Sequence, residues 1–162
     1  MGYLPFDPAT IFDPGKGPIL VEHMADREGF VADPAAAGTY RNASTGCSIA
    51  FIEPTPLPDS SLAVEGDEEA SFDLLAALKG RDATDVSATA QTSQLGSREE
   101  PGYFFDAAFI YTVESESLHV ITAARAFQDA GLGVAVMVLC QDETSVRDAA
   151  TVAWGAVRFD EG

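Results

Sequence analysis

The stretch Tyr103–Cys140, YFFDAAFIYTVESESLHVITAARAFQDAGLGVAVMVLC, decides the fold. It contains three runs rich in β-branched and aromatic residues, at 103–113, 118–127 and 134–140, and short turn-forming segments separate them. Strands joined by such short connections pair with antiparallel neighbours. The stretch therefore predicts three consecutive antiparallel strands.

The first of these runs has a clear two-residue period. Alternate side chains of a strand point to opposite faces of a sheet. The more apolar set is expected to face the core, and it comprises Tyr103, Phe105, Ala107, Phe109, Tyr111 and Val113.

Further elements extend from this stretch in both directions. The polar, threonine-rich run 86–95 predicts a fourth strand, and 39–41 with 47–52 predict a hairpin around a turn rich in Asn, Ser and Gly. A helix is expected to begin with Asp67 as its N-cap and to stop at Gly80. A second helix is expected from about Asp142 to about Val157, with a buried stripe that includes Trp154.

The order strand, strand, helix, four strands, helix predicts an α+β fold. We expect an antiparallel β-sheet of about six strands covered by two main helices, because no βαβ alternation is present. Residues 36–162 are assigned to a single α+β domain. Residues 1–35 are assigned to an irregular N-terminal arm, because Pro and Gly interrupt every regular pattern there. Within the arm, 19–24 fits either a short strand or one or two helical turns.

Three segments carry a family resemblance. The hairpin and Pro-rich turn at 40–54 (YRNASTGCSIAFIEP), the strand at 134–140 and the helix at 148–159 (DAATVAWGAVRF) resemble the Mog1/PsbP-like group of small α/β/α sandwiches. The resemblance covers about 38–159 and rests on element order. It implies a protein that binds other proteins, and it transfers no functional residue.

The chain is strongly acidic. Of its 162 residues, 26 are acidic and nine are basic, which gives a formal net charge of −17. Such a charge repels nucleic-acid phosphates and anionic lipid, so neither nucleic acid nor membrane is an expected partner. It attracts basic protein surfaces, although many acids and few lysines also suit a salt-adapted cytosol.

The acidity is concentrated between 53 and 73, where the chain has no Lys or Arg. Acids at a helix start on a solvated face are the preferred interpretation, and these carboxylates are also a candidate surface for binding a basic partner, with weak divalent-cation binding as a further alternative. The EF-hand order of ligands is absent from this stretch. The candidate residues are Glu53, Asp59, Glu65, Asp67, Glu68, Glu69 and Asp73.

Five other residues invite a chemical interpretation. Cys47 and Cys140 lack Cys-x-x-Cys spacing and lie in apolar strands, so buried free thiols are the preferred interpretation. A disulfide between them is the alternative, and it requires an oxidising compartment. Asp106 and Arg125 lie on apolar strands and are predicted to form a structural ion pair, because a lone buried charge is costly. His119 has no companion nucleophile motif and is interpreted as structural.

These observations favour a non-catalytic, acidic protein-binding module from a bacterium. No cofactor or metal site is predicted, and no catalytic constellation is found. One alternative is an acidic immunity-type inhibitor or chaperone of a basic toxin or effector. Another is a small-ligand carrier or enzyme with a pocket between the aromatic strand and a helix. We expect a soluble, cytoplasmic protein, because there is no secretory signal and no apolar run near the ~18 residues of a membrane span.

Overall fold

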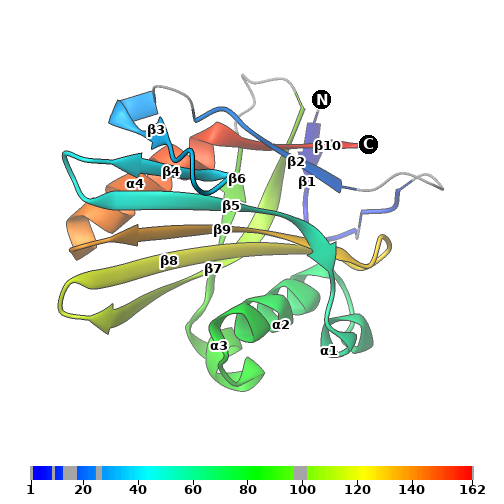
Figure 1. Ribbon diagram of the computed structural model, residues 1–162. Coiled ribbons are helices and arrows are strands. Elements are labelled where there is room, and N and C mark those ends of the chain that lie inside the picture. The colour runs from blue at the N-terminus through cyan, green and yellow to red at the C-terminus, as the bar shows by residue number, and fades with distance from the viewer. Residues whose placement is uncertain (1, 9, 13–17, 25–26, 97–101, 162) are drawn as a thin grey trace.

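A computed structural model describes residues 2–8, 10–12, 18–24, 27–96 and 102–161. Among them, ten strands form one sheet that curls into a half-barrel (Figure 1). The strands are β1 (Gly2–Leu4), β2 (Pro18–Glu22), β3 (Val31–Ala32), β4 (Thr39–Asn42), β5 (Cys47–Pro56), β6 (Gln91–Leu95), β7 (Tyr103–Ser115), β8 (Leu118–Phe127), β9 (Leu132–Cys140) and β10 (Val157–Glu161). The helices are α1 (Asp59–Ala63), α2 (Asp67–Lys79), α3 (Ala83–Thr89) and α4 (Glu143–Ala156), and a 3-10 turn spans Arg27–Gly29.

The long strand β7 organises the sheet. The main strand order is β2-β10-β7-β8-β9-β5-β4-β3, while β1 and β6 also pair with β7. The pairings among the described strands are antiparallel, except that β1 runs parallel to β7. β7 exchanges partners along its length, because β8 pairs with 108–115 whereas β1 and β10 pair near Tyr103.

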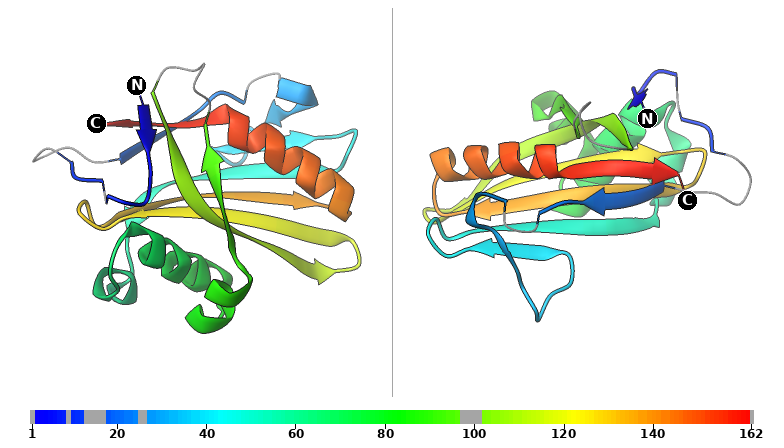
Figure 2. Two further views of the ribbon diagram at one scale, coloured as in Figure 1. Left: turned by 180° about the vertical axis from the view of Figure 1, so that it is seen from behind. Right: turned by 90° about the horizontal axis from the view of Figure 1, so that it is seen from above.

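Helices cover both faces of the sheet. Helix α4 packs on one face, and α2 with α3 packs on the other (Figure 2). The β8 strand shows the consequence, because Ile121 and Ala123 belong to the core on the α4 side whereas Ala124 and Ala126 belong to the core on the α2 side. Because helices cover both faces of the strand, 120–127 is buried at every position. Its side chains are apolar except for Thr122 and Arg125.

The prediction of about six strands covered by two main helices is wrong. The region expected to be an irregular arm contributes β1, β2 and β3 to the sheet, and residues after α4 add β10. The run 86–95, expected to be one strand, divides into the end of α3 and β6. The Asp82 side chain accepts a hydrogen bond from the Thr84 amide and so begins α3 one turn before that run.

The other predicted elements are present. The β4–β5 hairpin and strands β7, β8 and β9 lie within two residues of their expected bounds, except that β5 continues to Pro56. Gly80 ends α2 in the left-handed conformation (φ 62°), which a residue with a Cβ rarely adopts. Asp142 caps α4 by accepting the Ser145 amide at 2.7 Å. Asp67 is the first residue of α2, and the N-cap is Gly66.

Within the residues described, no helix combines the length and apolar character that a membrane crossing requires.

Candidate functional site

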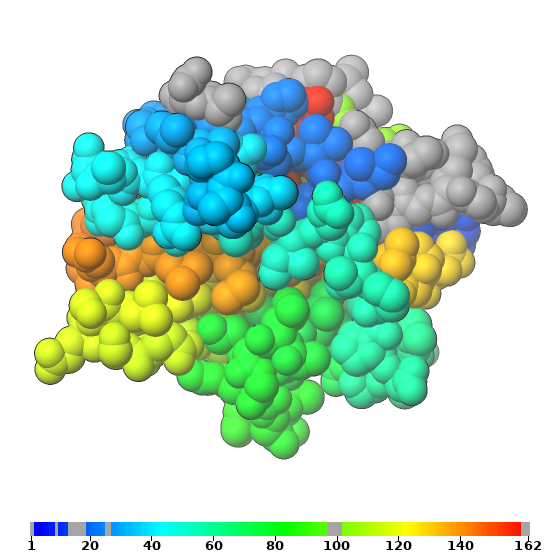
Figure 3. Space-filling view, in the orientation of Figure 1, coloured from blue at the N-terminus to red at the C-terminus, as the bar shows by residue number. Residues whose placement is uncertain are grey.

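The predicted acidic residues lie along the end of β5, α1 and the first half of α2. This part of the chain is the turquoise region at the right of Figure 3 and the green region next to it at the lower centre. Five of the seven are exposed, namely Glu53, Asp59, Glu65, Glu68 and Glu69, and we call these five the acidic surface. Asp73 is half-buried and accepts hydrogen bonds from the hydroxyls of Ser60 (2.7 Å) and Ser61 (2.6 Å).

Asp67 does not belong to this surface, because it is fully buried. Its Oδ2 lies 2.9 Å from Nη2 of Arg125, whose side chain is also fully buried. Burial lowers the pKa of Arg125, and the charge of Asp67 opposes this shift. The Asp67 carboxylate also accepts the amides of Thr10 (3.2 Å) and Gln128 (3.1 Å), so its charge is well compensated.

The predicted ion pair between Asp106 and Arg125 is therefore wrong, because Arg125 pairs with Asp67 instead. Arg125 donates from Nη1 to the main-chain carbonyl of Asp106 at 3.0 Å. The Asp106 carboxylate instead accepts the Tyr3 hydroxyl and the Phe6 amide. The hydrogen bond to Asp106 raises the pKa of Tyr3. Strand alternation correctly indicated a buried arginine that needs a carboxylate, but it could not show that the start of α2 supplies it.

The two cysteines form a disulfide, so the preferred interpretation as free thiols is wrong. The β5–β9 register places Ser48 opposite Leu139, and its next step places Cys47 opposite Cys140. Their Cα atoms are 4.3 Å apart, which is the spacing of a directly opposed, non-hydrogen-bonded antiparallel pair. The signal available in the sequence was the pairing of the two strands, which residue spacing alone does not reveal.

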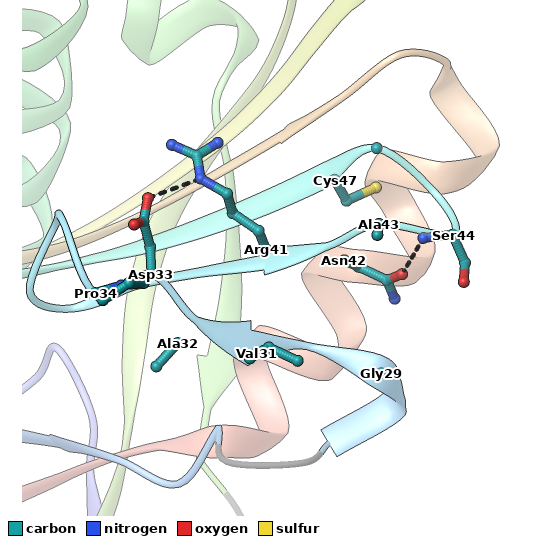
Figure 4. A pocket seen from close by; sticks show the side chains of 11 residues that line it. Gly29, Val31, Ala32, Asp33, Pro34, Arg41, Asn42, Ala43, Ser44 and Cys47 are labelled. Atoms are coloured by element: carbon teal, nitrogen blue, oxygen red, sulfur yellow. Dashed lines mark hydrogen bonds and ion pairs between the residues drawn. The ribbon is translucent and has the colours of Figure 1, made fainter.

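A cavity of about 550 Å³ lies at the β3–β4 edge of the sheet (Figure 4). Small apolar side chains such as Val31 and Pro34 line it, together with Cys47. Its charged groups neutralise each other, because Arg41 Nε donates to Asp33 at 2.8 Å and thereby lowers the pKa of Asp33. The residues that line this cavity include no histidine. The site can hold a small molecule, but it presents no group poised for proton transfer.

A polar cluster that sequence reasoning missed lies where β7 and β8 meet the first turns of α4. The Tyr111 hydroxyl is 2.6 Å from Nδ1 of His119, and the Arg147 guanidinium lies 4.9 Å from the centre of the Tyr111 ring. Arg147 also pairs with Glu143 on the same helix at 3.3 Å. His119 thus has a hydrogen-bond partner on the neighbouring strand. The geometry shows no nucleophile between these groups, and it agrees with a structural role for His119.

The space between the aromatic strand and α4 is filled by side chains. Phe105 is 1% exposed, and Tyr103 and Phe109 pack against the same core cluster. Phe109 also contacts Trp154 of α4, with ring centres 6.4 Å apart. This packing counts against a ligand pocket at the place where the carrier or enzyme alternative requires one.

Neither the arrangement of possible metal ligands nor comparison with known proteins indicates a function. No group of three or more His, Cys, Asp or Glu residues is arranged to hold a metal ion in the described part of the chain. No protein-family profile, curated protein or solved structure matches the sequence.

Proposed function

We propose that this protein is a non-catalytic binding module whose acidic surface contacts a basic surface on another protein. The observation that carries the proposal is the exposure of five carboxylates along 53–69 with no Lys or Arg between 53 and 73. Unpaired surface charge of one sign attracts a partner of the opposite sign and accelerates encounter. The acidic immunity-type or chaperone role fits the same surface and differs in the identity of the partner.

The scaffold under the acidic surface is held by specific contacts, which favours binding. Gln128, in the β8–β9 turn, donates to the carbonyls of Ser61 (2.9 Å) and Val64 (2.7 Å) and accepts the Gly66 amide (3.0 Å). The segment between α1 and α2 is therefore fixed before any partner arrives. Pre-organisation reduces the ordering entropy that association costs.

The test compares two triple variants in pull-down from lysate of the source organism. The first replaces Glu65, Glu68 and Glu69 with Gln, and the control replaces the exposed acids Glu116, Glu143 and Asp148 with their amides. Both remove three charges, so a partner specific to the acidic surface is retained by wild type and control but lost by the first variant. Affinity for the purified partner is expected to fall as salt rises. Equal retention by both variants, or retention independent of ionic strength, contradicts the proposal.

For the compartment, we propose that the disulfide-bonded form works in an oxidising environment. Cytosolic thiols are kept reduced, so a lasting Cys47–Cys140 bond favours a location outside the cytoplasm over the cytoplasmic expectation. Protein extracted from source cells after rapid thiol alkylation tests this. Unmodified cysteines that become reactive only after reduction support the proposal, and alkylated cysteines overturn it.

A further inference from the structure

The N-terminal segment, residues 2–8 and 10–12, is attached to the body by an unusual set of charged side chains. Four residues from separate elements contact it: Asp67, Asp106, Arg125 and Asp129. Together with the rings of Phe127 and Phe159 we call them the docking surface. Figure 2 shows β1 beside β7, with the rest of the segment passing along the outside of the molecule.

The docking surface recognises the main chain of the segment. Arg125 donates to the carbonyls of Leu4 (2.9 Å) and Pro5 (3.2 Å). In the opposite sense, amides of the segment donate to carboxylates of the body: Phe6 to Asp106 (3.3 Å), Thr10 to Asp67 (3.2 Å) and Phe12 to Asp129 (3.0 Å). Side chains that satisfy main-chain groups in this way are typical of peptide recognition.

Two phenylalanines anchor the segment. Phe6 and Phe12 are each 7% exposed, and both begin a Phe-Asp-Pro triplet. The Arg125 guanidinium lies 5.0 Å from the centre of the Phe6 ring, and Phe12 packs edge-on against Phe127 (5.3 Å). By contrast, Ile11 is 77% exposed. The segment is thus held at spaced anchor points.

β1 also completes the sheet at a place where a strand is missing. The β7–β8 ladder runs from Ser115 to Ala108, and beyond it β1 pairs with 103–105 of β7. Between these two pairings, the Arg125 side chain donates to the main-chain carbonyl of Asp106. Without β1 this edge of β7 would be open, and an open edge accepts another strand.

We propose that the docking surface is a peptide-binding site that accepts the N-terminal segment of a second copy of this chain, so that two molecules exchange segments and form a dimer. We choose this occupant because the spacing of the two phenylalanine anchors and the main-chain contacts match this segment. An exchanged dimer keeps the contacts of the monomer, so exchange requires no new complementarity. Its population rises with protein concentration by mass action.

The test uses full-length chains and a fluorescein-labelled peptide of residues 1–12. The chain's own segment competes with the peptide for the docking surface. Phe12→Ala in the chain weakens the docking of that segment, so the affinity of the chain for the peptide, measured by fluorescence anisotropy, is expected to increase at least tenfold. Phe6→Ala in the chain is expected to act in the same direction, and both chains are first checked for a cooperative thermal transition. The matched control, Ile11→Ala in the chain, leaves peptide affinity unchanged. A peptide that carries Phe12→Ala is expected not to bind.

A second measurement tests exchange between complete chains. Light scattering after size exclusion, on wild type held at concentrations up to ~1 mM, is expected to show a dimer fraction that rises with concentration and is lost in Phe12→Ala. Failure of both Phe6→Ala and Phe12→Ala chains to bind the peptide overturns the site. Wild type that stays monomeric at all concentrations, or a dimer that Phe12→Ala leaves intact, overturns the exchange.

Discussion

Arg125 is a fully buried cation whose charge is balanced chiefly by Asp67. Removing one partner of such a pair leaves an uncompensated charge in a medium that solvates it poorly. Asp67→Asn keeps the size of the side chain and removes its charge. We expect this variant to lose about 3–5 kcal/mol of unfolding free energy, measured by urea denaturation.

Glu68→Gln is the matched control, because it removes the neighbouring charge from an exposed position of the same helix. Its effect is expected to stay within about 0.5 kcal/mol. If both variants lose the same small amount, the Asp67–Arg125 pair does not stabilise the fold.

Tyr40 gives a residue-scale prediction for high pH. Burial raises the pKa of Tyr40 to about 12, and a hydrogen bond to Glu22 adds to the effect. Because the folded pKa exceeds the ordinary value of 10.0, folding favours the neutral phenol. This contribution is fully present below pH 10 and is lost as the pH rises toward 12.

Absorbance at 295 nm is expected to show a tyrosine that ionises near pH 12 in wild type and is missing in Tyr40→Phe. Stability of the variant is expected to fall less steeply than that of wild type above pH 10. An unchanged titration curve would mean that another tyrosine ionises last.

At the scale of elements, sequence patterns predicted the long strands well and the short ones poorly. β7, β8 and β9 have nine or more residues each, enough to display alternation or a continuous apolar run. β1 has three residues and β3 has two, so neither can display a period. β1 exists because β7, about a hundred residues away, offers it a pairing partner, which is tertiary information, and β3 exists because β4 pairs with it.

The candidate site shows the same division. Exposure of the acidic residues was predictable for Glu53, Asp59, Glu65, Glu68 and Glu69, because charged side chains normally stay in water. Asp73 is half-buried and Asp67 is fully buried, and nothing local in the sequence distinguishes Asp67 from its neighbours Glu68 and Glu69. Its burial follows from Arg125, 58 residues further along the chain.

At the scale of the β5–β9 pair, the disulfide is expected to contribute strongly to the free energy of unfolding. It links residues 93 positions apart, and closing so long a loop restricts the unfolded chain strongly. The double variant Cys47→Ser, Cys140→Ser is expected to lose about 2–5 kcal/mol of unfolding free energy.

Urea denaturation with and without dithiothreitol provides the control for this prediction. Reductant is expected to weaken wild type and to leave the double variant unchanged. If the double variant matches oxidised wild type, strand pairing alone holds β5 against β9.

At the scale of the whole molecule, the charge of −17 acts on stability as well as on partners. Among the residues that the structure describes, Arg125 is buried against Asp67 and Lys79 pairs with Glu114 at 3.1 Å, so neither is free to compensate the other acids. Self-repulsion in such a chain destabilises the compact state, and salt screens it over a Debye length of about 8 Å at 0.15 M. Sodium chloride is therefore expected to raise the melting temperature by several degrees between 10 mM and 1 M.

The Glu65→Gln, Glu68→Gln, Glu69→Gln variant separates this repulsion from other effects of salt. Removing three like charges relieves repulsion directly, so the variant is expected to melt above wild type at 10 mM salt and to match it at 1 M. Thermal melts followed by circular dichroism provide the measurement. If the difference between the two proteins stays constant as salt rises, the carboxylates act on stability through local contacts. The acidic surface is then compensated within the fold, which would also weaken the case for a basic partner.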